Sequence, residues 1–404
     1  MRISTSTLFN ANVAQLNTLQ GDMLQTQQQV ASGRAILTPA DNPVAAAQAL
    51  QLTQTDATNT QYMSNISMAQ NSQTLASGVL QNMNTLMQSV HTAVISAGNP
   101  GMTDSTRQSL ATTLQANLDQ LTAMANSQDS AGNYMFSGFK GTTQPFVSTP
   151  TGMQYQGDDG QRMIQVSQNS QVAASSSGAN IFMRIKNGNG SYVTQATATN
   201  TGTGIISGGT LTVPPPTAAQ LANTYTINFT SATTYTVTGV PSSVGLPVGA
   251  QAYVSGQAIS FNGMQFNISG APASGDTFTA APSTNQSVFT TISNFITALN
   301  TPVTSPAIGA QLNASIQSAL SGLTNAMNNV STANAAVGSN LNGMAALTSA
   351  EANQGVQYKA ALSLLQDVNM TQAITDLTQQ QTILKAAQQS FVSVQNLSMF
   401  NYMR

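Results

Sequence analysis

A seven-residue apolar repeat runs through both ends of the 404-residue chain. Near the start its members are Phe9, Leu16, Met23 and Val30, and near the end they are Met370, Leu377, Leu384 and Phe391. A heptad repeat keeps one stripe of an α-helix facing a partner helix. We therefore expect both ends to form helices that pack lengthwise against other helices, as in a coiled coil.

These stripes are half polar. Val13 and Ile374 fill the intervening seam position once, whereas the later ones hold Gln20, Gln27, Gln381, Gln388 and Gln395. Most helical stability in proteins comes from burying an apolar face, and a half-polar seam buries little. We expect the two ends to order only against each other or against a neighbouring subunit, which predicts a subunit of an assembly. A plain intramolecular bundle stays open, because coiled-coil seams usually carry opposite charges on their flanks and these do not.

The last turns of the chain concentrate large apolar side chains, among them Val394, Leu397 and Phe400. Left in water, such a terminus would expose an apolar patch of the kind that marks an interaction site. We therefore include these three residues, together with Ile374, in the predicted packing set.

Charge is scarce in this sequence. Only 5% of the residues are charged and the formal net charge is −2, against about 25% charged residues in ordinary soluble proteins. A nearly neutral surface favours association over dispersal. Binding to nucleic acid needs a clustered excess of Lys and Arg, so we expect no nucleic-acid partner.

The residue inventory also argues against catalysis. There is no cysteine and one histidine, His91, so disulfides, thiolate sites and multi-histidine metal sites are excluded. His91 lies in a helix-periodic stretch, where a structural role is the simpler interpretation. We expect no catalytic residue, no metal and no cofactor.

The chain shows neither a secretory signal nor a membrane span. Residues 1–7 are polar and lack the apolar core of a signal peptide. No apolar run approaches the ~18–20 residues that a membrane helix needs. We expect no membrane partner, and either a cytoplasmic protein or one exported by a route that reads no cleaved signal.

Turn and cap residues divide the amino-terminal part into three helices. The first is predicted over residues 5–32 and ends at Gly33, because glycine readily adopts the left-handed conformation that closes helices. Asp41-Asn42-Pro43 starts a second helix that runs to about Ala97. After a break at residues 98–101, Thr103 or Asp104 caps the third.

Residues 141–285 have a different texture, rich in Gly, Pro, Thr and Ser with short alternating runs typical of strands. Residues 157–160 (Gly-Asp-Asp-Gly) are predicted to turn a hairpin between residues 153–155 and 163–164. Helical texture returns after residue 285. We predict an α+β fold, in which both chain termini form an elongated helical bundle and carry an inserted β-rich surface region. The predicted parts are 1–140 and 286–404 for the helical core and 141–285 for the insert.

The insert could instead house an enzyme or a carbohydrate-binding module. Asp158 and Asp159 could be imagined as a carboxylate pair, although adjacent acids flanked by glycine are typical turn residues. Five tyrosines could line a sugar-binding face, although strand tyrosines are normal sheet packing; they are Tyr155, Tyr192, Tyr225, Tyr235 and Tyr253.

Several short motifs resemble one known family. Ser32-Gly33-Arg34 followed by Asp41-Asn42-Pro43 resembles the amino-terminal signature shared by bacterial flagellins and flagellar hook–filament junction proteins. The stretch 132–139, with Gly132, Asn133, Phe136, Gly138 and Phe139, is similar to the segment where junction proteins leave their helical body. Residues 397–404 look like the end of the same proteins, and residues 270–278 resemble a stretch of hook-associated surface domains.

The resemblance implies a structural subunit that is secreted to the extracellular flagellum at the hook–filament junction. Its implied partners are other copies of itself, the hook-side junction protein (hook-associated protein 1), flagellin, and an export chaperone with the flagellar secretion apparatus. The implied role is an adapter ring between the hook-side junction protein and the filament. A flagellin filament subunit is the alternative within the family, and a surface carbohydrate-binding or adhesin module is the alternative from another class.

Some positions depart from the family pattern. Asn42 stands where a second acid is usual, Asn334 and Asn340 where arginines are frequent, and Gln366 and Asn369 where acids are common. Acids and bases are replaced by amides together, so we expect neutral hydrogen bonds where relatives use charge pairs; surface ion pairs contribute only about 0–1 kcal/mol.

Overall fold

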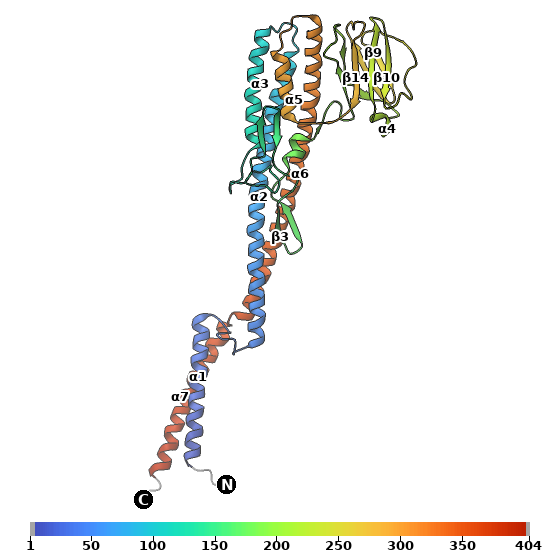
Figure 1. The fold of residues 1–404 in the computed structure, drawn as a ribbon. Helices are drawn as coiled ribbons and strands as arrows, with labels where there is room; N and C mark the ends of the chain where they lie inside the picture. The colour runs from blue at the N-terminus through green and yellow to red at the C-terminus, as the bar shows by residue number, and fades with distance from the viewer. Residues whose placement is uncertain (1–4, 401–404) are drawn as a thin grey trace. The chain divides into compact units, whose positions relative to one another are not determined.

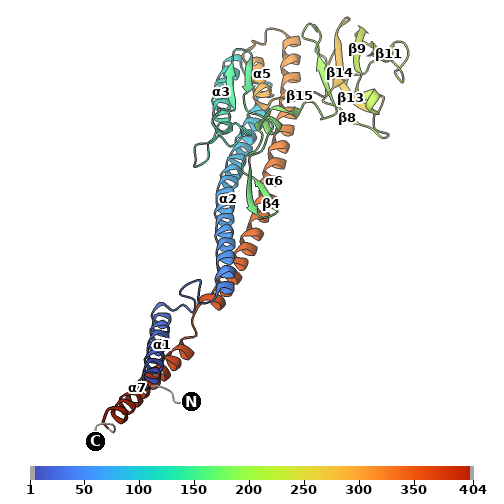
Figure 2. The same cartoon turned by 60° about the horizontal axis from the view of Figure 1, so that its bottom comes forward.

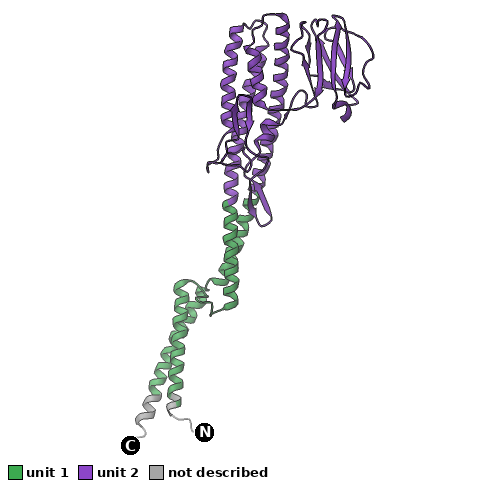
Figure 3. Ribbon diagram, in the orientation of Figure 1, with its two compact units in different colours: residues 1–64, 346–404 green, residues 65–345 purple. Residues whose placement is uncertain are grey.

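The computed structural model describes the backbone of residues 5–400 and the side chains of residue 7 and residues 9–393. The chain folds into two compact units, which Figure 3 colours separately. We call Met1–Ser64 with Ala346–Arg404 the terminal unit, and Asn65–Ala345 the central unit. These units cut across the three predicted parts, so the division at residues 140 and 285 stays a prediction about which segments fold independently.

Within residues 5–400, six long or medium helices carry the fold (Figure 1): α1 (Thr5–Ser32), α2 (Pro43–Ala97), α3 (Asp104–Ala125), α5 (Val288–Asn300), α6 (Pro306–Gln366) and α7 (Met370–Phe400). The predicted helix starts and ends agree with these bounds. Gly33 has φ +72° directly after α1, and the Thr103 hydroxyl accepts a hydrogen bond from the Thr106 N–H at 3.2 Å at the start of α3. With helices at both ends and strands between them, the α+β fold class is confirmed.

The helices of the central unit share one apolar core. α3 packs beside α5, and both lie against α2 and α6 (Figure 1). Leu80, Met83, Leu114, Phe295 and Leu323 are at most 2% exposed. Burying a side chain of this size contributes about 1.5–3 kcal/mol. Packing of the four helices against one another therefore stabilises this unit.

Four phenylalanines attach the irregular segments to this helical core. Phe146 lies 5.5 Å from Phe182 and 5.2 Å from Phe289 between ring centroids, and Phe136 lies 5.4 Å from Phe182. All four are fully or almost fully buried. Tilted and edge-to-face aromatic pairs are favourable beyond their burial, so the chain between α3 and α5 is fixed to the helices at this cluster.

The strands lie between α3 and α5: β1 (Phe146–Thr149), β2 (Gly152–Tyr155), β3 (Met163–Ser167), β4 (Ser170–Ala173), β5 (Ile185–Lys186), β6 (Tyr192–Ala196), β7 (Ile205–Ile206), β8 (Thr210–Leu211), β9 (Thr224–Ser231), β10 (Thr234–Val240), β11 (Gln251–Ala252), β12 (Ala258–Phe261), β13 (Met264–Ser269), β14 (Thr277–Pro282) and β15 (Asn285–Gln286). Two short helices join them, the π-helix η1 (Ala179–Met183) and α4 (Ala218–Leu221).

The predicted hairpin around residues 157–160 is wrong. β2 pairs with β1, and β3 pairs with β4, so β2 and β3 belong to separate ribbons. The acidic turn instead serves a long-range contact: the Asp158 carboxylate accepts a hydrogen bond from the Phe139 N–H at 2.8 Å. Strand pairing depends on such distant contacts, which a local Gly-Asp-Asp-Gly pattern does not encode.

Residues 187–284 form a compact β domain within the central unit. One sheet has the strand order β11-β10-β9-β14-β6, and the other has β12-β13-β7 with β8 also paired to β13. Alternate residues of both sheets form one core that includes Tyr225, Phe229, Phe266 and Phe278. The β domain therefore has its own apolar core, distinct from that of the helices.

The β domain leaves and rejoins the helical core through a two-stranded ribbon. Lys186 of β5 pairs with Asn285 of β15, and Ile185 pairs with Gln286. The adjacent side-chain amide of Asn325, on α6, donates to the carbonyls of Lys186 at 2.8 Å and Gly188 at 2.9 Å. The point of exit and the point of return therefore lie side by side.

Neutral polar contacts fix α2 against α6. In the central unit the Ser77 hydroxyl donates to the Asn334 amide oxygen at 2.8 Å, a neutral contact of the kind expected at Asn334. In the terminal unit the Asn59 amide donates to the Glu351 carbonyl at 2.9 Å. Such bonds compensate polar groups that lose contact with water, so they link α2 and α6 at defined positions along both helices.

Candidate assembly interface

The two heptad stripes meet each other in the terminal unit. α1 runs beside α7 in both views (Figure 1, Figure 2), and the rings of Phe9 and Phe391 lie 5.3 Å apart between centroids. The other paired stripe positions are half-buried: Leu16, Met23, Val30, Leu377 and Leu384. The structure thus brings Phe9 and Phe391 together within one chain and leaves the other five positions partly covered.

Burial in this helix pair is shallow. Among its described side chains, only Thr26 of α1 and Ala373 of α7 are fully buried. Phe9 remains 43% exposed even with Phe391 beside it. Two helices without a third layer cannot enclose a core, so α1 and α7 leave much of their apolar surface in water.

Other predicted packing residues remain exposed to solvent. Met370 and Ile374 are 44% and 50% exposed. The same helices carry further exposed apolar side chains, Leu24, Ile383 and Val392. Val394, Leu397 and Phe400 lie outside the described side chains. The exposed set is an unpartnered apolar surface on helices that would otherwise be polar outside.

The Ser32-Gly33-Arg34 motif is bonded to residues 366–368, where the chain passes from α6 to α7. We call this contact between residues 32–35 and 366–368 the joint. The Ala35 N–H donates to the Gln366 carbonyl at 2.7 Å, and the Val368 N–H donates to the Gly33 carbonyl at 3.0 Å. Arg34 and Asp367 form an isolated β-bridge here. The Ser32 hydroxyl accepts from the Arg34 N–H at 3.3 Å. These bonds tie the end of α1 to the start of α7.

Asp41 stabilises the loop of residues 35–41, which follows the joint. Its carboxylate accepts from the Leu37 and Thr38 N–H groups at 2.9 and 2.8 Å, and from the Gln25 amide at 3.0 Å. The hydrogen bond from the Thr38 N–H, followed by that from Leu37, holds the pKa of Asp41 below its ordinary value of 3.8. The Gln29 amide donates to the Ala35 carbonyl at 2.7 Å. The loop is therefore folded onto the last turns of α1.

Asn42 and Pro43 begin α2 as the motif predicts. The Asn42 amide oxygen accepts from the Ala45 N–H at 3.0 Å, which satisfies one of the free donors of the first turn. Pro43 follows as the first helical residue, where its missing N–H is harmless. An amide caps a helix as well as an acid does, so the neutral residue at position 42 keeps this function.

The second motif, residues 132–139, connects α3 to the small ribbons. Gly132 has φ +79° and Gly138 φ +71°, a conformation that costs other residues more. The Asp129 carboxylate accepts from the Asn133 N–H at 2.9 Å. Phe136 is fully buried, whereas Phe139 is 67% exposed. The motif is a structural crossing, and a Cβ at Gly138 would clash with Asp158.

Asp158 and Asp159, considered as a carboxylate pair only under the enzyme alternative, have a structural role. Asp158 accepts from the N–H groups of Phe139 and Gly160 at 2.8 and 2.9 Å. Asp159 pairs with Arg184 at 2.7 Å, and this hydrogen bond lowers the pKa of Asp159 and raises the pKa of Arg184. Both carboxylates are therefore engaged in contacts that stabilise the fold.

The tyrosines do not form an exposed sugar-binding face. Tyr192 is 1% exposed and Tyr225 is 0% exposed, and burial raises the pKa of Tyr192 to about 12. The Tyr192 hydroxyl donates toward the Thr210 and Gln265 carbonyls, both at 3.0 Å. Tyr235 is also buried. These rings fill the β-domain core, as strand tyrosines usually do.

Within the described parts of the chain, no group of three acids or histidines is placed to hold a metal ion. No described helix is long and apolar enough to cross a membrane. The terminal unit carries exposed apolar side chains on α1 and α7 and the hydrogen-bonded joint.

Sequence reasoning found the joint's motif residues but missed their partners. Gln25 and Gln29 carried no signal, because a glutamine on a helix surface is uninformative. The carbonyl of Gln366 and the N–H of Val368 act through the backbone, which any residue provides. Only the break in helical texture before Asn369 could have indicated that the second strand of the bridge lies there.

Comparison with known proteins agrees with this architecture. Residues 3–141 match the bacterial flagellin N-terminal helical region. Flagellar hook associated protein-3 of Legionella pneumophila is 33% identical over 78% of this chain and 98% of its own, with a TM-score of 0.73. The chain belongs to the flagellar hook-associated protein 3 family. FlgL of Xanthomonas campestris is 30% identical over 77% of this chain and 99% of its own, with a TM-score of 0.72.

The similarity to this family spans whole chains. Flagellar hook-associated protein 3 of Salmonella typhimurium is 25% identical over 100% of both chains. Membership in the hook-associated protein 3 family confirms the predicted resemblance, the location in the flagellum at the hook–filament junction, and a structural rather than enzymatic role.

Proposed function

We propose that this chain forms an adapter ring between the hook-side junction protein (hook-associated protein 1) and the flagellin filament, with α1 and α7 as its assembly elements. The observation that carries this proposal is the shallow burial of the terminal unit. A pair of helices with apolar side chains on both its inner and outer faces fits an element that completes its core with neighbouring copies.

The physical driving force would be burial rather than charge. α1 contains one charged residue, Asp22, and α7 contains Asp376 and Lys385. Covering one large apolar side chain contributes about 1.5–3 kcal/mol, so several exposed positions per copy offset the entropic cost of assembly. Because few charges take part, assembly should depend little on salt, since screening acts on ion pairs.

The same shallow burial supports export before assembly. A helix pair that gains most of its stability from neighbours costs little to unfold, as passage through a narrow secretion channel requires. A flagellar export chaperone would cover the apolar carboxyl-terminal helix until then. Packing residues Phe9, Leu16, Leu377 and Leu384 would be covered first by each other and then by adjacent copies.

The test replaces the outward apolar side chains and leaves the α1–α7 seam intact. In a strain lacking the protein, Leu24→Gln with Ile374→Gln should yield hooks without filaments and flagellin in the medium. Both residues are at least half exposed, so the substitutions should not unfold the monomer. The matched control is Val248→Gln, a 94% exposed apolar residue of the β domain, which should restore full filaments.

The adapter proposal fails if the deletion strain builds normal filaments. It also fails for these residues if the double variant restores filaments as well as the control does. Normal filaments containing this chain along their whole length would instead support the alternative of a filament subunit.

A further inference from the structure

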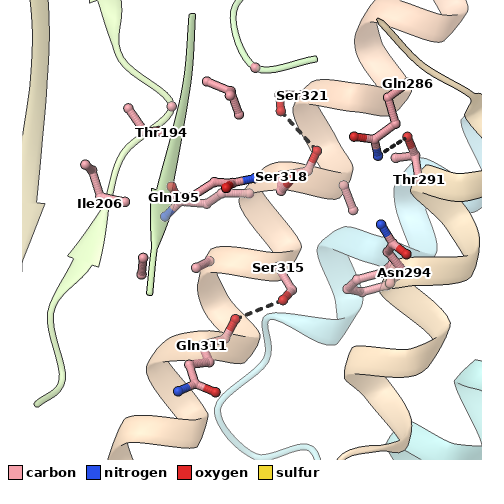
Figure 4. A pocket seen from close by; sticks show the side chains of 18 of the residues that line it. Thr194, Gln195, Ile206, Gln286, Thr291, Asn294, Gln311, Ser315, Ser318 and Ser321 are labelled. Atoms are coloured by element: carbon pink, nitrogen blue, oxygen red, sulfur yellow. Dashed lines mark hydrogen bonds between the residues drawn. The ribbon is translucent and has the colours of Figure 1, made fainter. Parts of the chain in front are cut away.

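A polar cleft lies in the central unit beside the β domain. Its volume is about 340 Å³. Strand β6 of the β domain forms one wall, α5 forms another, and the exposed face of α6 lies between them (Figure 4). The cleft is unrelated to the joint and to the helix pair of the terminal unit.

Free amide groups line this cleft. The side chains of Gln195 on β6, Asn294 on α5 and Gln317 on α6 are exposed and have no hydrogen-bond partner among the described residues. Each amide offers two donor hydrogens and an acceptor oxygen. Figure 4 shows Gln195 on the strand side and Asn294 on the α5 side, with Ser315 and Ser318 of α6 between them.

Other polar groups of the cleft are already satisfied and hold its shape. The Gln311 amide on α6 donates to the Ala198 carbonyl at 2.8 Å, which links α6 to the chain after β6. The Gln286 amide donates to the Thr291 hydroxyl at 3.0 Å. The free amides are therefore mounted on walls that neighbouring bonds position, which lowers the ordering cost of binding.

The lack of charged side chains in the lining indicates which class of ligand the cleft can bind. No charged side chain lines the cleft. Residues 187–286 contain one charged residue, Asp276, which is buried and accepts the N–H groups of Thr201, Gly202 and Ala273. An anion or a cation would lose its hydration here without a counter-charge, so the cleft fits a neutral ligand.

The lining also has apolar areas suited to the C–H faces of a sugar ring. The accessible apolar side chains of Ala198 and Ala314 contribute to the walls beside the free amides. A mixture of apolar surface and a few hydrogen-bonding groups is typical of small-molecule sites. Sugars present this combination, since each ring carries C–H faces and a rim of hydroxyls that both donate and accept.

We propose that this cleft binds a short neutral glycan, with Gln195, Asn294 and Gln317 hydrogen-bonding its hydroxyls. The volume is at the lower end of the ~300–1,000 Å³ typical of ligand pockets, which fits one or two sugar rings. An extended peptide added along the edge of β6 is the competing ligand, but a strand along the length of β6 would need more space than this cleft has.

The experiment titrates the full-length monomer with three neutral disaccharides, maltose, lactose and N,N′-diacetylchitobiose. Binding is followed by saturation-transfer NMR and calorimetry. At least one disaccharide should bind saturably, and the anionic sugar N-acetylneuraminic acid should not. Gln195→Ala with Asn294→Ala should weaken binding at least tenfold.

Two further variants separate a site from a general effect. Ser318→Tyr adds bulk to an exposed cleft residue without removing a free amide, and should abolish binding. Asn313→Ala removes an exposed amide of the same helix that does not line the cleft, and should leave binding unchanged. Circular dichroism checks that all variants fold.

The proposal is overturned if none of the three disaccharides binds saturably, or if the cleft variants bind as the wild type does. It is also overturned if a blocked neutral peptide of alternating Thr and Val binds in the cleft and the disaccharides do not. Each of these outcomes leaves the adapter role untouched, because that role rests on the terminal unit.

Discussion

The central and terminal units both use α2 and α6, yet they bury the apolar side chains of these helices very differently. In the central unit Leu80 and Met83 of α2 are at most 1% exposed. In the terminal unit Val44 and Leu50 of the same helix are 67% and 72% exposed, and Leu364 of α6 is 89% exposed.

The difference is the number of layers. α3 and α5 cover α2 and α6 in the central unit, whereas Ala49 and Ala373 are the fully buried apolar side chains among those described in the terminal unit. α2 and α6 are thus part of a closed apolar core in the central unit and of an incompletely covered one in the terminal unit. A closed core stabilises the fold of a single chain, and an incompletely covered one is what the proposed assembly with neighbouring copies would complete.

The largest expected effect comes from removing the end of the terminal unit. Deletion of residues 394–404 should block incorporation at the hook tip, because it removes apolar side chains that neighbouring copies would cover. Electron microscopy of flagella from the truncated strain measures this. The thermal unfolding of the β domain should not change. Full-length filaments seeded by a normally exported truncation would break the comparison.

Hydrogen exchange should separate the two units in the isolated monomer. Amides of α1 and α7 should exchange orders of magnitude faster than those of α3 and α5, since local opening is cheap where few apolar contacts are lost. The assembled form should protect all four helices. Equal protection of α1 and α3 in a dilute monomer would mean that the terminal unit is already a complete core.

Matched leucine substitutions should show the same contrast in stability. Leu114→Ala removes a side chain of α3 that is 0% exposed and should cost about 2–5 kcal/mol of unfolding free energy. Leu16→Ala, at a half-buried position of α1, should cost less than about 1.5 kcal/mol in the monomer. Chemical denaturation followed by circular dichroism measures both, and similar losses would contradict the layer argument.

The smallest expected effect is a loosening of the joint in acid. The folded-state pKa of Asp41 lies below the ordinary value of 3.8, so its stabilisation is fully present above that value and is lost as the pH falls through the lower folded pKa. Amide exchange of residues 37–38 should rise at the acid end of that range. Asp41→Asn should remove this pH step, and an unchanged step in the variant would assign it to another group.

Sequence predicted the helical half of the fold well because helix ends are local. Gly33, Asn42-Pro43 and Thr103 each act within a turn or two of their own position. The strand pairing near residues 157–160 failed because Asp158 binds Phe139, nineteen positions away. Local patterns give the elements, and long-range hydrogen bonds decide their pairing.

The candidate interface shows the same limit. The heptads predicted a contact between the stripes of α1 and α7, and the rings of Phe9 and Phe391 make one such contact. They did not indicate that Leu24 and Ile383 stay exposed, because a heptad pattern shows one seam and not the number of helix layers around it. The cleft at Gln195 and Asn294 gave no signal at all, since its walls come from three distant segments.

The ribbon of β5 and β15 bears on how such a chain can diversify. Its two strands are one hydrogen-bonded spacing apart, about 4.8 Å, where Lys186 faces Asn285. Any domain whose own ends lie equally close could replace residues 187–284 without moving a helix. Gene fusion at this ribbon would therefore graft a foreign domain onto a flagellar subunit while α1 and α7 stay unaltered.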